Sequence, residues 1–599
     1  MDSIKAFITK YFFTFTYFYK KLKYRLFIRI GLNITVGALD GFGLAMFLPL
    51  LQMAGNSSSE NSSDSLGKLG FLVDFITDVG IEFNLFNILC IMTFFFFLKG
   101  IAAYINSIYS VKLKQYFIRT MRINLSHHMA KMSYKNFVTS DAGRIQNTLT
   151  GELGRMSNAY ENYFGAFQQL ILTVVYMVFA FTVDAQFALL IGVGGILTNF
   201  IFKFLYASTK KASSKITKGS NQYQKLIIQF VTNFKYLKAT GKINVYTEKL
   251  KEAIHYIENY NFKIGKLSSI ITSIREPVLI LIVSVVILVE VNYLGGSLGV
   301  ILISLLFFYK AMNALMFMQT AYNKFLEVSG SMDNMTAFEN ELVEATEPKG
   351  KIKFSTFNNT ILIDGASFSY DEQLILNNIS LTVTKNDTVA FVGESGSGKS
   401  TLVNIIAGLM PLNTGRIQVD NIDYNQLNKN TFQSRIGYIT QEPVIFSDTI
   451  FNNITFWDDE NPETLERFRL ALKQASILDF VNELEFGKDT ELGNNGVNLS
   501  GGQRQRISIA RELYKDIDIL IMDEATSALD SETEKAIQKS IESLQGSYTI
   551  LIVAHRLATI KNADRIVLMD KGAVVESGSY QELIATSTRF RHMTSLQQV

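Results

Sequence analysis

The chain has 599 residues, 48% of them apolar, with 46 Phe, 26 Tyr and a single Trp. This length exceeds what one hydrophobic core holds, so we expect at least two domains, and the apolar excess indicates a chain that lies partly in lipid. The formal net charge is only +3 and no long basic run is present, which argues against a nucleic-acid partner. A single cysteine, Cys90, excludes a disulfide framework or a cysteine-based metal site within one chain.

Residues 1–25 mix charged and aromatic side chains and lack the small-residue cleavage site of a secretory signal. This pattern predicts an amphipathic elbow helix that lies at a membrane surface and leads into a first span.

Residues 26–340 are mostly hydrophobic and predict an α-helical membrane domain. Six stretches are long enough to cross a hydrocarbon core of about 30 Å at about 1.5 Å per residue. They are 26–54, 83–110, 162–183, 186–207, 269–292 and 296–318.

The polar connections between these spans predict their orientation. Connections 111–160 and 203–267 are rich in Lys and Arg, whereas the loop after the first span has almost none. The positive-inside rule therefore places both long connections, and both chain ends, on the cytoplasmic side of a multi-pass protein of the cytoplasmic membrane.

Five ionisable side chains fall inside the expected spans: Asp40, Lys99, Arg275, Glu276 and Lys310. Counted from the outer ends of the spans, they converge at depths of about 20–25 Å. Each costs about 2.5–3.5 kcal/mol when it faces lipid, so we expect all five to face the bundle interior or a wet cavity. Either the carboxylates pair with cations and only fix helix packing, or the unpaired cations bind an anionic head group such as phosphate or pyrophosphate.

Residues 341–352 carry charge, Pro and Gly and predict a linker. In residues 353–599, β-type apolar runs alternate with helical ones, which predicts a soluble α/β domain.

The segment from Gly393 to Ser400 fits G-x-x-x-x-G-K-[ST] and follows an apolar strand. In such a loop the backbone N–H groups and a helix N-terminus bind phosphate oxygens, the lysine reaches the terminal phosphates and the Ser hydroxyl ligates Mg²⁺. The loop predicts that ATP and Mg²⁺ bind at Gly393, Ser395, Gly396, Ser397, Gly398, Lys399, Ser400 and Thr401.

A second apolar strand delivers Asp523 and Glu524 to its polar end. We expect Asp523 to hold Mg²⁺ and Glu524 to orient or activate the attacking water.

The sequence between these two motifs resembles that of one particular family. Residues 499–503 read Leu-Ser-Gly-Gly-Gln and resemble the signature of ATP-binding cassette (ABC) ATPases. Further residues match the family in the same order along the chain. Tyr370 resembles the aromatic residue that stacks on adenine, and Gln441 resembles the glutamine that reaches the γ-phosphate and Mg²⁺. Asp530 corresponds to the loop that contacts the other cassette in the dimer, and His555 corresponds to the switch histidine.

The family resemblance implies a P-loop ABC nucleotide-binding domain that hydrolyses ATP, with Glu524, His555 and Gln441 as catalytic residues. It also implies that two cassettes sandwich two ATP molecules, each completed in trans by Ser500, Gly501, Gly502 and Gln503. Because one chain carries one cassette, a second half-transporter is required. A homodimer is the economical expectation, and a heterodimer with a different partner chain is the alternative.

Six spans followed by a cassette resemble the exporter type of half-transporter. The resemblance implies two coupling loops in the cytosol, with tips near Asp141–Arg144 and Phe234–Tyr236. One departure concerns the segment before the signature, where many exporters have Gly-Glu-x-Gly and this chain has Asn494 and Asn495 between two glycines.

The membrane segments around Asp40, Lys99, Arg275 and Lys310 resemble exporters that flip lipid-linked oligosaccharides and related glycolipids. The implied function is ATP-driven export or flipping, by alternating access, of a lipid or lipid-linked glycan with an anionic head group. A multidrug or peptide exporter is the alternative, and an ATPase that remodels or signals at the membrane without transport is the third hypothesis.

Overall fold

The structure is a computed structural model that describes residues 13–47, 49–50, 80, 82, 84–183, 185–289, 298–370, 373–524, 531–554 and 560–597. Its contacts divide the chain into two units. The first comprises Met1–Met132 and Ser140–Ala345, and the second comprises Ser133–Thr139 and Thr346–Val599. The second unit therefore combines the expected α/β domain with a short piece from the first long connection.

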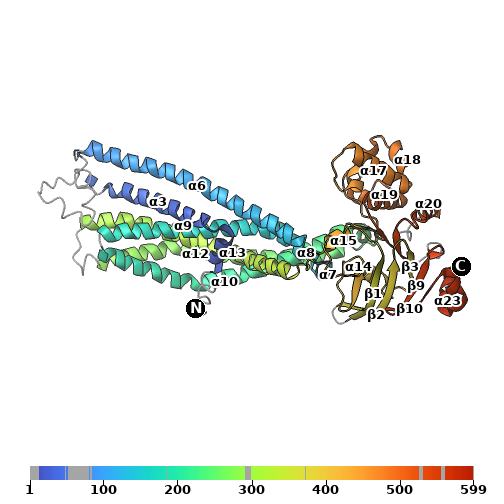
Figure 1. Ribbon diagram of the computed structural model, residues 1–599. Coiled ribbons are helices and arrows are strands. Elements are labelled where there is room, and N and C mark those ends of the chain that lie inside the picture. The colour runs from blue at the N-terminus through green and yellow to red at the C-terminus, as the bar shows by residue number, and fades with distance from the viewer. Residues whose placement is uncertain are drawn as a thin grey trace. The chain divides into compact units, whose positions relative to one another are not determined.

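The described part of the first unit is helical (Figure 1). Its elements are α2 (Phe13–Leu22), α3 (Arg25–Ala45), α6 (Leu85–Met129), α8 (Ala142–Asn147), the π-helical turn η2 (Thr148–Glu152), α9 (Leu153–Val183), α10 (Ala185–Thr232), α11 (Phe234–Ala239), α12 (Ile243–Val289) and α13 (Leu298–Glu344).

Several of these helices are much longer than a membrane is thick. Helix α6 has 45 residues, or about 68 Å at about 1.5 Å per residue, and begins where the Asn84 side chain accepts a hydrogen bond from the backbone N–H of Asn87 at 2.8 Å. Such a length exceeds a hydrocarbon core of about 30 Å, so each long helix extends an expected span into the adjoining connection.

Within the described residues, four segments have the length and apolarity to cross a membrane: Arg25–Ala45, Leu85–Met129, Ala142–Thr182 and Ile243–Val289. They correspond to the expected first, second, third and fifth spans. The expected fourth and sixth spans fall in helices α10 and α13. In these helices the structure does not describe the side chains of residues 187–188, 190–201 and 298–305.

The expected elbow corresponds to α2, which buries an aromatic anchor. Phe18 is fully buried, and its ring lies 5.4 Å from Phe117 of α6 and 5.6 and 5.3 Å from Tyr160 and Phe164 of α9, measured between centroids. Aromatic pairs at these separations add packing energy beyond burial alone. This apolar contact fixes α2 against the α6–α9 pair.

The second unit is built of two sheets with surrounding helices. Its strands are β1 (Thr360–Tyr370), β2 (Gln373–Thr384), β3 (Thr388–Val392), β4 (Thr414–Val419), β5 (Ile422–Asp423), β6 (Ile436–Ile439), β7 (Ile519–Asp523), β8 (Thr549–Val553), β9 (Arg565–Asp570) and β10 (Ala573–Gly578). Its helices are α7 (Tyr134–Thr139), α14 (Lys399–Ile406), α15 (Lys429–Gln433), α16 (Ile450–Thr455), α17 (Pro462–Gln474), α18 (Leu478–Glu483), α19 (Gly501–Tyr514), α20 (Ser531–Glu542), α22 (Tyr580–Thr586) and α23 (Thr588–Gln597), with short 3₁₀ turns at Gly487–Asp489 and Asn494–Gly496.

The larger sheet has the order β10-β9-β3-β8-β7-β6 and the smaller, antiparallel one β2-β1-β4-β5. Strands β9, β3, β8, β7 and β6 run parallel. Because the carboxyl ends of parallel strands meet at one edge, the residues that follow β3, β6 and β7 converge there. The phosphate loop, Gln441 and the acidic pair all lie at this edge.

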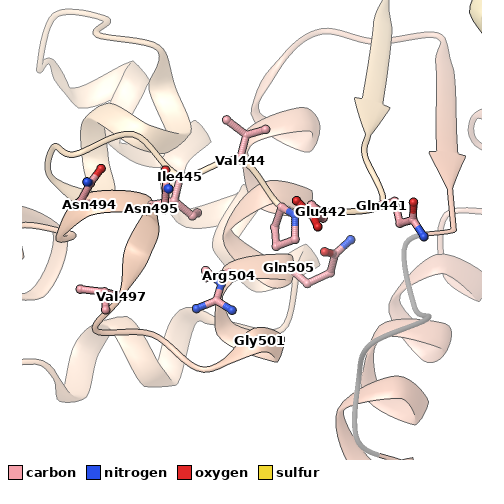
Figure 2. A pocket seen from close by; sticks show the side chains of 11 residues that line it. Gln441, Glu442, Val444, Ile445, Asn494, Asn495, Val497, Gly501, Arg504 and Gln505 are labelled. Atoms are coloured by element: carbon pink, nitrogen blue, oxygen red, sulfur yellow. The ribbon is translucent and has the colours of Figure 1, made fainter. Parts of the chain in front are cut away.

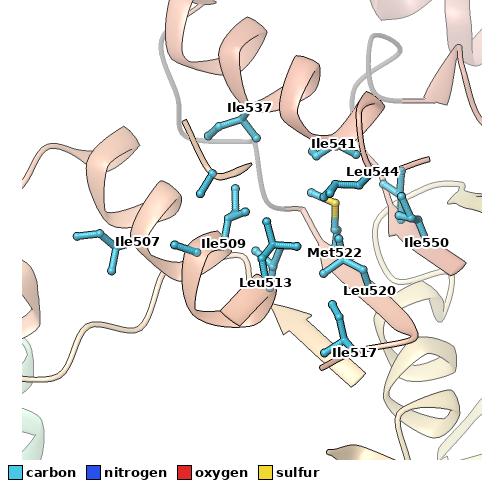
Figure 3. Close-up of a cluster of buried hydrophobic side chains, with 14 of the residues drawn as sticks. Ile507, Ile509, Leu513, Ile517, Leu520, Met522, Ile537, Ile541, Leu544 and Ile550 are labelled. Atoms are coloured by element: carbon cyan, nitrogen blue, oxygen red, sulfur yellow. The ribbon is translucent and has the colours of Figure 1, made fainter. Parts of the chain in front are cut away.

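A buried apolar cluster joins the signature helix α19 to the larger sheet (Figure 3). Ile507, Ile509 and Leu513 of α19 pack with Leu520 and Met522 of β7, all at most 7% exposed. These side chains belong to one continuous core, so displacing α19 would disturb the strand that carries Asp523.

Candidate functional site

The phosphate loop connects β3 to α14 through three glycines with positive φ, Gly393, Gly396 and Gly398. At Gly393 φ is +149°, and a Cβ atom there would lie 2.1 Å from the carbonyl oxygen of Met569. At Gly398 φ is +98°, and a Cβ would meet the Leu376 side chain at 2.6 Å. Both positions therefore require glycine, and the loop places the N-terminus of α14 at the sheet edge.

Lys399 is 5% exposed and lies inside this loop. Its ammonium donates to the carbonyl oxygens of Gly393 and Glu394, both at 2.9 Å. Burial lowers the pKa of Lys399, opposed by the negative charges of Glu524 and Asp523. These two carbonyls hold the ammonium at the loop, where triphosphate oxygens would compete for it.

The expected Mg²⁺ ligands lie together. The Ser400 hydroxyl donates to Oδ1 of Asp523 at 3.0 Å, so the two oxygens converge although the residues are 123 positions apart. A hydroxyl and a carboxylate are hard oxygen donors of the kind that Mg²⁺ binds beside a phosphate, so this pair fits the ion.

The expected water-activating carboxylate contacts the expected γ-phosphate glutamine. Nε2 of Gln441 donates to Oε2 of Glu524 at 2.8 Å. Glu524 has φ of +50°, an uncommon conformation for a non-glycine residue, and its backbone N–H donates to the carbonyl of Val553 on β8 at 3.1 Å. Such strained backbone clusters at functional sites.

The expected adenine platform, Tyr370, ends β1 and is half-buried. Its ring meets that of Phe368 edge-on, with centroids 4.9 Å apart. The ammonium of Lys135, from α7, lies 5.7 Å from the centroid of the Phe368 ring. A cation over an aromatic face is attractive, and this contact from the first connection was not expected from the sequence.

The signature residues form the start of α19. Ser500 Oγ accepts from the backbone N–H of Gln503 at 3.2 Å, and Oε1 of Gln503 accepts from the backbone N–H of Ser500 at 2.8 Å. This capping box fixes the first turn, with Ser500 and Gly501 exposed and Gly502 buried. The exposed part of the turn presents backbone donors of a helix N-terminus to solvent.

A hollow of about 690 Å³ connects Gln441 to the segment before the signature (Figure 2). Gln441 lies at one end, Asn494 and Asn495 at the other, and Arg504 between them. Asn494 occupies the glutamate position of the Gly-Glu-x-Gly segment of many exporters, so this wall of the hollow carries the neutral amides of Asn494 and Asn495.

Arg511 belongs to none of the sequence motifs, although its position directly after the apolar residues Ile509 and Ala510 was a signal that could have identified it. It is 3% exposed and donates to the carbonyl of Val444 at 2.7 Å, and to the carbonyl and Oδ1 of Asn453 at 2.5 and 2.9 Å. Val444 follows Gln441 by three residues. Arg511 therefore ties the signature helix α19 to residues 441–444, the glutamine segment.

Two expected residues, His555 and Asp530, lie outside the described residues.

In the first unit, the structure brings together Asp40 and Lys99. Their side chains form an ion pair at 2.6 Å, with Asp40 4% and Lys99 30% exposed. The hydroxyl of Tyr176, which the sequence did not single out, donates to the other carboxylate oxygen of Asp40. Glu276 and Lys310 form no ion pair with any residue that the structure describes, and the Arg275 side chain lies outside the described part.

The expected coupling residues have defined surroundings within the first unit. Asp141 caps α8 by accepting from the backbone N–H of Arg144 at 3.0 Å, and Arg144 forms a bidentate pair with Glu341 of α13 at 2.8 and 2.9 Å. Phe234 and Tyr236 of α11 are 47% and 68% exposed. Their coupling role stays a prediction.

Comparison with known proteins establishes the family. Residues 376–527 match the model of the ABC transporter family, and residues 31–320 match that of the ABC transporter transmembrane region. The chain therefore belongs to the ABC transporters, as a half-transporter of the exporter type that couples ATP hydrolysis to transport.

Two relatives are similar to the chain over both domains. An ATP-dependent lipid A-core flippase of Desulfotalea psychrophila is 30% identical over 512 residues, which cover 84% of this chain and 88% of the relative. A protein of the same name from Francisella novicida is 32% identical over 504 residues, covering 79% and 82%. The solved structure of a bacterial Atm1-family ABC exporter with ATP bound has the same fold, with a TM-score of 0.78 at 22% identity over 96% of this chain and 100% of that one.

Proposed function

We propose that the chain is one half of a homodimeric flippase that moves a lipid or lipid-linked glycan with an anionic head group across the cytoplasmic membrane. Each half has six spans, with the cassette and both termini in the cytoplasm, and the dimer works by alternating access. The observation that carries the proposal is similarity to lipid A-core flippases over about four-fifths of the chain, combined with an assembled ATP site.

In this proposal the ATP site is shared by two subunits. Backbone N–H groups of residues 393–401 bind the phosphates, Tyr370 stacks on adenine, and Lys399 exchanges its two loop carbonyls for phosphate oxygens. Glu524 orients the attacking water and Gln441 positions that carboxylate, with His555 at the γ-phosphate. Ser400, Asp523 and Gln441 would hold Mg²⁺, which would supply positive charge to neutralise the phosphates. The partner subunit's Ser500 and the turn that follows it complete the site, so both halves close only when ATP is bound.

Lys99 is the proposed head-group contact. An ammonium has three N–H donors, and the contact with Asp40 accounts for one of them. With 30% of its side chain exposed, Lys99 can present the others to a phosphate, while Tyr176 and Asp40 hold its position. Asp40 lowers the cost of keeping this cation at membrane depth when no head group is bound.

The test is ATP-dependent movement of labelled phospholipids and polyprenyl-pyrophosphate glycans across proteoliposomes. We expect movement of an anionic lipid by the wild type, none by Glu524→Gln, and a large loss in Lys99→Met with basal ATP hydrolysis preserved. Asp40→Asn is the matched variant, because it breaks the same ion pair but keeps the cation. Equal losses in Lys99→Met and Asp40→Asn would mean that the pair only fixes helix packing.

No movement of any lipid by the wild type would refute the flippase proposal and favour the multidrug or peptide exporter.

A further inference from the structure

A groove of about 620 Å³ runs between α6 and α9, away from Asp40 and Lys99. Its lining residues are Val111, Lys114, Gln115, Ile118, Arg119, Arg122, Ile123 and Ser157. On α6 these positions recur every three or four residues, so they share one face of that helix. The groove lies just beyond the second expected span, where a helix leaves the hydrocarbon for the head-group layer.

Two of the cations in this groove have no partner. Arg119 and Arg122 are exposed and form neither an ion pair nor a hydrogen bond within the described part of the chain. Lys114, by contrast, is paired with Glu161 of α9 at 2.5 Å. The groove therefore has an excess of two positive charges, both on guanidinium groups that bind phosphate in a bidentate manner.

The same face of α6 continues toward the N-terminus as an exposed apolar stripe. Its members are Phe94, Phe97, Ile101, Tyr104, Ile108 and Val111, each between 41% and 68% exposed. The stripe spans 18 residues, a rise of about 26 Å from first to last, which is close to the thickness of the hydrocarbon core. It ends directly at the groove.

The direction of the arginine side chains links the stripe to the groove. Helical side chains lean toward the N-terminus of their helix, and on α6 that is the apolar end. Arg119 and Arg122 therefore extend toward the membrane, as basic side chains do when they reach a lipid head group from the aqueous side. The groove walls made by Val111, Ile118 and Ile123 are apolar, which suits the first carbons of the acyl chains.

We propose that this groove binds the phosphate of one anionic phospholipid of the inner leaflet, whose acyl chains lie along the apolar stripe of α6. The inference rests on the proposed function for the membrane orientation. The bound lipid is distinct from the transported one, because Arg119 lies 20 residues from Lys99 on the same helix, about 30 Å along its axis. A second copy of the chain is a poorer occupant, since burying two unpaired guanidinium groups is costly unless carboxylates face both.

The experiment measures lipid binding to the full chain in detergent by native mass spectrometry, with phosphatidylglycerol and phosphatidylcholine as probes. The test variant is Arg119→Gln/Arg122→Gln. The control variant, Lys112→Gln/Lys131→Gln, removes the same charge from the α6 region outside the groove. At about 1 kcal/mol per basic residue, we expect the test variant to bind phosphatidylglycerol about 30-fold more weakly. We expect the control variant to resemble the wild type, and inorganic phosphate at millimolar concentration not to displace the lipid.

Three results would overturn the proposal. The test variant binds phosphatidylglycerol as the wild type does, the control variant loses as much affinity, or the test variant dissociates from dimer to monomer in the same spectra, which identifies the groove as a subunit interface. Basal ATP hydrolysis of each variant verifies folding. Lipid movement by the wild type is measured separately, so a failure of the flippase proposal leaves a different signature: intact lipid binding without transport.

Discussion

Replacing Arg511 with methionine tests whether this buried guanidinium holds the signature helix to the glutamine segment. The variant leaves the carbonyl of Asn453, a fully buried residue, without a charged donor, and it also removes the bonds to Oδ1 of Asn453 and to the carbonyl of Val444, an exposed residue. An unsatisfied buried acceptor costs about 1–3 kcal/mol, and with the two other bonds we expect a loss of about 3 kcal/mol. For a domain of this size that lowers Tm by about 6–12 °C.

Trp457 makes the measurement specific, because it is the only tryptophan in the chain. Its indole N–H donates to Asp448 at 2.7 Å and its ring centroid lies 5.4 Å from that of Phe446, which also faces the Arg511 guanidinium. Thermal unfolding of the full chain followed by tryptophan emission therefore reports on the segment that Arg511 holds.

Two further variants complete the test. Arg511→Lys keeps the charge but has one nitrogen for three acceptors, so we expect an intermediate Tm. Arg506→Met, on the same helix, removes bonds from a half-buried arginine, and we expect a smaller change. A Tm of Arg511→Met within about 2 °C of the wild type, or equal to that of Arg506→Met, would refute the reasoning.

The other predictions concern the ATP site. Glu524→Gln is expected to bind ATP normally and to lose at least about 100-fold in turnover, as a colorimetric phosphate assay would show; near-normal hydrolysis would contradict the assignment. Lys399→Ala is expected to weaken ATP binding measured by calorimetry. In the wild type, burial lowers the pKa of Lys399, so the lysine loses its proton at a lower pH than an ordinary lysine does. ATP affinity is therefore expected to begin to fall at that lower pH as the pH rises. This pH dependence should disappear in Lys399→Ala. Gly393→Ala is expected to abolish ATP binding, because the added Cβ would lie 2.1 Å from the Met569 carbonyl; an unchanged dissociation constant would show that the loop can shift.

The ATP site was the part of the molecule most accessible from sequence. Ser400 and Asp523 lie far apart in the chain, but Ser400 belongs to the motif that follows β3 and Asp523 ends β7 in a motif of its own, and parallel strands bring such ends to one edge. The family match confirms the cassette and the exporter type, and the expected count of six spans stays a prediction beside the four segments found.

Contacts between helices were less accessible, because apolar periodicity gives the buried face of a helix but not its neighbour. Pairing of Asp40 with a cation was anticipated as one alternative, yet Tyr176 lies 136 residues away and carries no motif. Arg511 is similar: its charge directly after the apolar residues Ile509 and Ala510 was visible, but two of its three acceptors are backbone carbonyls, which no residue type reveals. Lys135 over Phe368 likewise depends on how α7 packs within the second unit.

The end of α13 forms ion pairs with two other helices. Glu339 pairs with Lys21 of α2 at 2.8 Å, and Glu341 pairs with Arg144 of α8. Two residues along a helix correspond to a rotation of about 200°, so the two carboxylates leave α13 on nearly opposite sides. Partly exposed pairs of this kind contribute up to about 1 kcal/mol each and weaken as salt is added. Ionic strength therefore acts on both ion pairs together, weakening the attachment of α2 and of α8 to α13 while the apolar packing of Phe18 persists.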